Sequence, residues 1–138
     1  MSQADVFTQE QTLKEGVLYT LNAGMWKGGI ATLTAERFYR RTRGFAILPT
    51  VLGLLGRLIN QAFPWKVEID IPLASISVIG RGKMGLKTDV LYIETMDSKP
   101  YQFTPNYQPW LAALQDALQT YSHATLVQSG DERWSVQR

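Results

Sequence analysis

The hydrophobic pattern of residues 106–121 predicts an amphipathic helix. At helical spacing its large apolar side chains share one face, formed by Tyr107, Trp110, Leu111, Leu114, Leu118 and Tyr121. We expect Asn106 to accept hydrogen bonds from the first free N–H groups, and Pro109 lies in the first turn, where a missing N–H costs little. Such a wide apolar stripe needs an apolar partner, so we expect the helix to pack on a curved sheet.

Seven short segments before this helix have the composition or the alternation of β-strands. In 66–71, three apolar residues alternate with Glu68 and Asp70, so we expect both carboxylates on the solvent-facing side. Glycine-rich stretches at 23–29 and 80–85 are interpreted as a loop and a flexible basic turn. The expected strands are 16–22, 30–34, 37–42, 66–71, 75–79, 88–95 and 101–104.

These elements predict a mainly β fold, a partly open seven-stranded barrel that the amphipathic helix closes. A chain of 138 residues is long enough for one domain, which we place at 15–121 after an N-terminal extension at 1–14. Two alternatives stay open for 122–138, a short hairpin across 129–131 or a disordered tail, and we favour the tail.

A long apolar insert at 44–65 interrupts the strand pattern, with Arg57 as its one charge. Its stretch 50–63 is too short and too interrupted for a transmembrane helix, which needs roughly 20 apolar residues, so we interpret it as an amphipathic helix. Left in water, its apolar side chains would forfeit on the order of 10 kcal/mol of burial. The domain itself, a second protein chain or a lipid surface could cover it, and we favour lipid because arginines and an aromatic residue flank the insert.

Composition argues against catalysis. The chain has no cysteine and a single histidine, His123, so we predict no catalytic residue, no metal site and no cofactor. Carboxylates on a solvent-facing strand lack the burial that an acid–base pair needs. The glycines of 80–85 have the spacing of a dinucleotide loop, but this segment joins two strands, and no helix N-terminus would meet a phosphate. We therefore expect a protein that is not an enzyme.

Positive charge is concentrated in the middle of the chain. The net charge is +2, but residues 37–99 hold ten basic and five acidic residues, or +5, and the flanks hold four and seven, or −3. Arginine forks bind phosphate through two nitrogens, which suits an anionic headgroup. Nucleic acid is disfavoured because aromatic residues suited to base stacking are not interleaved with the arginines, apart from Tyr39.

Several short motifs, in order, resemble the GRAM family, a branch of the pleckstrin-homology-like superfold. Residues 31–38 (Ala-Thr-Leu-Thr-Ala-Glu-Arg-Phe) resemble its strand–turn–strand, and residues 69–76 (Ile-Asp-Ile-Pro-Leu-Ala-Ser-Ile) resemble its isoleucine-proline-leucine step. Its closing strands and final helix are matched by 91–95, 101–103 and 110–111. The resemblance covers about 15–121, and the apolar insert is similar to insertions in bacterial members. It implies a non-catalytic module that docks on membrane lipids or protein partners.

By the same resemblance, three loops meet at one open rim, where Lys27, Arg43, Lys66 and Lys99 would gather. We therefore predict a cytoplasmic, peripherally membrane-associated module that binds anionic phospholipid. The alternative is a homo-oligomeric or adaptor module whose insert packs against another chain. The candidate headgroup-binding residues are Lys27, Arg40, Arg41, Arg43, Arg57 and Lys66. The candidate membrane or partner contacts are Phe45, Leu52, Leu54, Leu55, Leu58, Ile59, Phe63 and Trp65.

Overall fold

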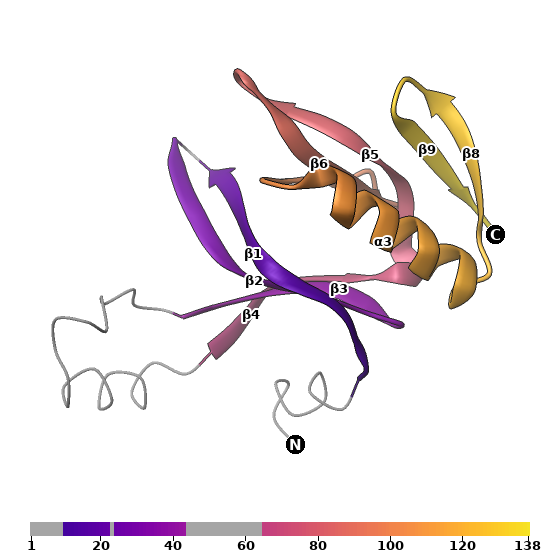
Figure 1. Cartoon of the computed structure of the whole chain (residues 1–138), viewed down its shortest axis with the longest axis horizontal. Helices are drawn as coiled ribbons and strands as arrows, with labels where there is room; N and C mark the ends of the chain where they lie inside the picture. The colour runs from indigo at the N-terminus through magenta and orange to yellow at the C-terminus, as the bar shows by residue number, and fades with distance from the viewer. Residues whose placement is uncertain (1–9, 23, 44–64) are drawn as a thin grey trace, which may run out of the picture.

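The computed structural model describes residues 10–22, 24–43 and 65–138, which form two antiparallel sheets and one helix (Figure 1). The first sheet has the order β1-β2-β3-β4, with strands Thr12–Asn22, Met25–Thr34, Arg37–Arg43 and Trp65–Pro72. The second has the order β7-β6-β5-β9-β8. In chain order, β5 to β9 are Ile76–Met84, Lys87–Thr95, Pro100–Phe103, Thr125–Gly130 and Arg133–Gln137. Helix α3 spans Tyr107–Thr120, and the 3-10 turn η1 (Leu73–Ser75) joins the sheets.

The two sheets do not close into a barrel within the described residues. Besides η1, they are joined at one edge by a single bridge. There the Tyr19 N–H donates to the Thr104 carbonyl at 2.7 Å, and the Thr104 N–H donates to the Tyr19 carbonyl at 3.0 Å. The predicted mainly β fold is confirmed, whereas the predicted seven-stranded barrel is replaced by two sheets with nine described strands.

Helix α3 packs against both sheets and brings its apolar stripe to the centre of the core (Figure 1). Phe38 of β3 lies edge-on to Phe103 of β7 and to Trp110 of α3, with ring centroids 5.1 and 5.6 Å apart. Leu114 on the same stripe is fully buried. The last position of the predicted face is wrong, because Tyr121 follows the helix and is 43 % exposed.

Asp89 of β6 caps the N-terminus of α3. Its Oδ2 accepts a hydrogen bond from the Asn106 N–H at 2.8 Å, and its Oδ1 accepts one from the Tyr107 N–H at 2.9 Å. These two bonds stabilise the carboxylate and hold the pKa of Asp89 below its usual value. Asn106 has a left-handed backbone (φ 67°) and makes no side-chain cap, so the predicted cap is wrong.

Two hairpins are longer than the sequence predicts. β2 begins at Met25 and β5 continues to Met84, so most of the expected loop at 23–29 and the expected turn at 80–85 is strand. The glycines that suggested loops allow close packing between strands instead. A Cβ on Gly28, for example, would lie 2.4 Å from an aromatic ring of β1.

Both ends of the predicted domain also extend further. β1 begins at Thr12, within the expected extension 1–14, and Leu13 packs against the core. In 122–138, β8 and β9 pair with each other and β9 pairs with β5, so the tail interpretation is wrong and the hairpin alternative is right. Trp134 of β9 packs against the core, which explains why this hairpin is attached.

Candidate functional site

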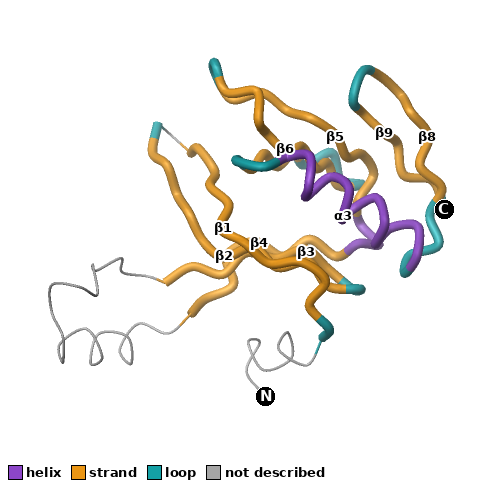
Figure 2. Tube along the Cα trace, in the orientation of Figure 1, coloured by secondary structure: helices purple, strands orange, loops and turns teal. Residues whose placement is uncertain are grey.

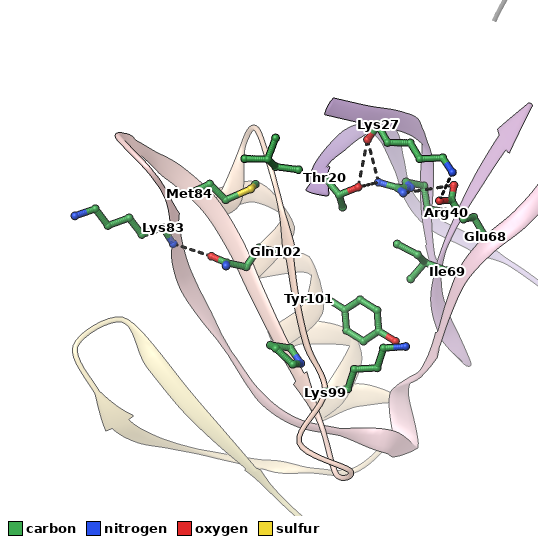
Figure 3. Close-up of a pocket in the computed structure, with 12 residues that line it drawn as sticks. Thr20, Lys27, Arg40, Glu68, Ile69, Lys83, Met84, Lys99, Tyr101 and Gln102 are labelled. Atoms are coloured by element: carbon green, nitrogen blue, oxygen red, sulfur yellow. Dashed lines mark hydrogen bonds and ion pairs between the residues drawn. The ribbon is translucent and has the colours of Figure 1, made fainter. Parts of the chain in front are cut away.

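A cleft of about 650 Å³ lies between the first sheet and strands β5 and β7 of the second (Figure 3). One wall comes from β1 to β4, and the other from β5, β7 and the turn before β7. Four basic residues and one acidic residue are among its lining residues, a net charge of +3, although the Lys83 side chain points away from the other lining groups (Figure 3). The charged residues are Lys27, Arg40, Glu68, Lys83 and Lys99.

Arg40 is buried in the first wall, with 1 % of its surface exposed. Its Nη1 donates to the Thr20 hydroxyl at 2.9 Å and to the Lys27 carbonyl at 3.3 Å. Its Nη2 lies 3.5 Å from Oε2 of Glu68. Burial lowers the pKa of the Arg40 guanidinium, and the negative charge of Glu68 opposes this shift. Arg40, a predicted headgroup-binding residue, is thus engaged in contacts within the protein that join β1, β2 and β4 to β3.

Glu68 is the carboxylate of the cleft. Its Oε1 lies 2.7 Å from the Lys27 Nζ, and its Oε2 accepts a hydrogen bond from the Thr42 hydroxyl at 3.0 Å. Burial acts to raise the pKa of Glu68. The hydrogen bonds from Lys27 and Thr42 and the charge of Arg40 outweigh burial, so this pKa lies below its usual value.

A register shift in the β3–β4 ladder places Glu68 there. The shift falls between the pairs made by Arg40 and by Arg41, and it leaves Glu68 without a direct partner in the ladder. Glu68 consequently reaches the cleft, whereas Asp70 pairs with Arg37 at 3.4 Å and does not line it. The prediction that both carboxylates share one solvent-facing side is therefore wrong, because a local bulge breaks the alternation.

The second wall carries two lysines that form no ion pair with any described residue. Lys99 runs beside Tyr101, with its Nζ 5.2 Å from the ring centroid, whereas the Lys83 side chain points away from Arg40 (Figure 3). The Lys83 N–H donates to Oε1 of Gln102 at 2.9 Å. Gly82 makes room for this contact, because a Cβ there would lie 2.5 Å from the same oxygen.

The predicted headgroup residues are dispersed. Lys27 lines the cleft, but Arg41 lies 3.4 Å from a carboxylate of β1, away from the cleft lining. Lys66 is exposed and does not line the cleft. Arg43 ends β3, and Arg57 lies outside the described residues.

Of the four residues that the family resemblance places at one rim, the structure brings Lys27 and Lys99 to the same cleft. Sequence reasoning missed Lys83 as a site residue because 80–85 was interpreted as a flexible turn. The signal that could have found it is the pair of lysines that flank a methionine, a glycine and a leucine, between two β-prone segments.

The predicted membrane or partner contacts lie almost entirely outside the described residues. This applies to Phe45, Leu52, Leu54, Leu55, Leu58, Ile59 and Phe63, while Trp65 begins β4. Their roles stay predictions.

Two features are absent from the described part of the chain. No helix there has the length and apolar character needed to cross a membrane. Among the same residues, no group of three or more histidine, aspartate or glutamate side chains could hold a metal ion.

Comparison with known proteins adds a likeness in fold. No family model matches the sequence, and no curated protein matches it. The structure is similar to a crystal structure of the C-terminal domain of an unknown protein from Leishmania infantum, with a TM-score of 0.55 and 12 % sequence identity. The match covers 83 % of this chain and 90 % of that one. At this identity the likeness shows a shared fold and carries no function.

Proposed function

We propose that this chain is a non-enzymatic, GRAM-like module that binds anionic phospholipid at a membrane surface. The observation that carries the proposal is the cleft between the sheets, whose lining residues carry a net charge of +3. Lys99 in the cleft and Lys83 at its edge have no ion-pair partner among the described residues. Their charge is therefore available to an anion from outside the protein.

The chemistry of the lining favours binding over reaction. Lysine ammonium groups act as point charges toward phosphate, and the Thr20 and Gln102 side chains add neutral polar groups. The single carboxylate of the lining, Glu68, is held ionised by its neighbours, which suits a structural role better than proton transfer at neutral pH. Two sheets packed with one helix also agree with the architecture that the GRAM resemblance implies.

The experiment is co-sedimentation of the full chain with vesicles of phosphatidylcholine, with and without phosphatidylserine. The bound fraction should rise with phosphatidylserine content and fall as salt is added, because screening weakens attraction between exposed charges. Equal binding to both kinds of vesicle, or binding to neither, would overturn the proposal.

A second candidate, an adaptor or homo-oligomer, is favoured by the outer strand of the second sheet. Strand β8 stands at the sheet edge, has no charged residue in Thr125–Gly130, and leaves Val127 41 % exposed. Such an edge is a template for pairing with another chain. A dimer detected by light scattering that Val127→Lys abolishes, in a protein that ignores vesicles, would favour this candidate.

A further inference from the structure

Two hairpin turns expose large apolar side chains next to the cleft. Met25 and Trp26 follow the β1–β2 turn and are 73 % and 48 % exposed, and Leu86 in the β5–β6 turn is 99 % exposed. Each turn contains a glycine with positive φ, Gly24 at 78° and Gly85 at 59°. A Cβ added at either glycine would meet no atom within 4 Å, so both turns project into open space.

The two turns belong to one surface. The Nζ of Lys87, the first residue of β6, lies 5.0 Å from the centroid of the Trp26 ring, which links one hairpin directly to the other. Both turns lie at the same end of the molecule (Figure 2). Leu21 and Met84, from the same two hairpins, line the cleft. The turns therefore flank its mouth.

The charged residues within the two turn segments have one sign. Segments 22–28 and 82–88 together contain three lysines, Lys27, Lys83 and Lys87, and no acidic residue. The nearest carboxylate in sequence is Asp89, which is engaged in capping α3. An apolar tip bordered by cations and an indole ring matches the interface of an anionic bilayer, where aromatic rings lie at headgroup depth and lysines meet phosphate.

We infer that the β1–β2 and β5–β6 turns insert together into an anionic lipid surface, with Met25, Trp26 and Leu86 entering the bilayer boundary. Lys83 and Lys87 then lie at the level of the lipid phosphates, with the cleft mouth beside them. This inference rests on the proposed function and adds the part of the molecule that enters the membrane. Membrane insertion is assigned to two described hairpins, and this assignment does not depend on the role predicted for the 44–65 insert.

A lipid surface fits these turns better than a protein partner. The apolar side chains lie at the projecting ends of two hairpins, and Leu86 is exposed almost completely, so they present no groove to a partner. A bilayer interface needs no matching shape and accepts single apolar side chains beside cations. The uniform positive charge of 22–28 and 82–88 also complements an anionic surface.

The test uses the absence of cysteine from the sequence. Leu86→Cys carries one environment-sensitive fluorophore, and Met96→Cys is the matched control because Met96 is 61 % exposed beyond the opposite end of β6. With phosphatidylserine vesicles, the probe at position 86 should shift to the blue and become protected from an aqueous quencher, while the probe at 96 should do neither. Unlabelled Leu86→Ser should lose binding several-fold with an unchanged Tm.

The outcomes separate this inference from the function it rests on. If the labelled proteins sediment with phosphatidylserine vesicles but the probe at 86 stays in water, the inference is overturned and the proposed function stands. If neither protein sediments, both are overturned. A blue shift at 86 on mixing with unlabelled protein alone would indicate a contact between copies and would also overturn insertion into lipid.

Discussion

In β3, Arg37, Arg40 and Arg41 each lie within 3.5 Å of a carboxylate on another segment, whereas Lys83 and Lys87 of the β5–β6 hairpin form no ion pair with a described residue. The arginines lie in an inner strand of the first sheet, between β2 and β4, where β4 supplies Glu68 and Asp70, and β1 and the residues before it supply Glu15 and Glu10. The lysines lie beside a projecting turn, where the nearest carboxylate in sequence is Asp89, which caps α3. Position in the sheet therefore decides which cations stay available.

This comparison changes which residues should be tested for binding. Arginine has the better geometry for phosphate, and that preference made β3 the leading candidate in the sequence. The fold uses those guanidinium groups for its own cohesion, and Arg40 is the most deeply buried of them. The lysines of the β5–β6 hairpin, weaker ligands individually, stay available to a partner.

Removing the buried guanidinium should have the largest effect on stability. Arg40→Met should lower the free energy of unfolding by about 3 kcal/mol, because it breaks a pair with one buried partner and leaves Glu68 with fewer donors. Chemical denaturation monitored by circular dichroism measures this loss.

Two further variants are the controls for this prediction. The double variant Arg40→Met with Glu68→Gln should recover part of the loss. Lys83→Gln should stay within about 0.5 kcal/mol of the parent protein. An equal loss for Arg40→Met and Lys83→Gln would remove the distinction between the two groups of cations.

Removing the unpaired lysines should weaken vesicle binding and leave the stability of the protein nearly unchanged. Lys83→Gln combined with Lys99→Gln should weaken binding to phosphatidylserine vesicles about thirty-fold, since each lysine near an anionic surface contributes about 1 kcal/mol. The free energy of unfolding should change little, because neither side chain forms an ion pair with a described residue. Co-sedimentation and denaturation are measured on the same preparation. Unaltered vesicle binding in this variant would contradict the role given to the cleft.

Local periodicity was enough to predict most of the elements. The stripe from Tyr107 to Leu118 defines α3 because burial on one side of a helix recurs every three to four residues. The same holds for the alternation at 66–71 in β4. These patterns depend on neighbours within a single element, which a sequence displays directly.

Features that depend on contacts between elements could not be predicted. Glycine normally weakens a strand, but Gly28 and Gly82 sit in strands because side chains of other strands approach them closely. The β8–β9 hairpin is fixed through pairing of Trp134 with Ile79, a residue far away in the sequence. Neither relation is visible in the local pattern.

The site was the least predictable part. Arg40 and Arg41 are adjacent and identical in type, yet one is buried in the cleft wall and the other pairs with a different carboxylate. The bulge that brings Glu68 into the cleft has no signature in a segment that alternates regularly. Which charged groups are available to a ligand depends on tertiary contacts, whereas composition gives only the net charge.

Neutralising the carboxylate of the cleft should lower the stability of the protein and tighten its binding to anionic vesicles. Glu68→Gln should lower the free energy of unfolding by about 1 kcal/mol, through weaker hydrogen bonds to Lys27 and Thr42. It should also tighten binding to phosphatidylserine vesicles about fivefold, because Lys27 loses its partner and the lining gains one net positive charge. Asp70→Asn is the matched control, since it removes the same charge outside the cleft lining. Equal tightening in both variants would show that net charge, and not the cleft, governs binding.

Acidification should remove the same contribution of the Glu68 charge to stability that Glu68→Gln removes. The pKa of Glu68 in the folded protein lies below its usual value of 4.5, so its charged form stabilises the fold above that pH. This contribution is lost as the pH falls through the lowered pKa.

Asp89, Asp97 and Glu132 also have lowered pKa values and add to the loss of stability in acid, so a scan of the parent protein alone does not isolate Glu68. The difference in Tm between the parent protein and Glu68→Gln does isolate it. That difference should be constant near neutral pH and shrink in acid as Glu68 becomes protonated. A difference that persists in acid would mean that the carboxylate charge is not what holds Lys27 and Arg40 in the wall of the cleft.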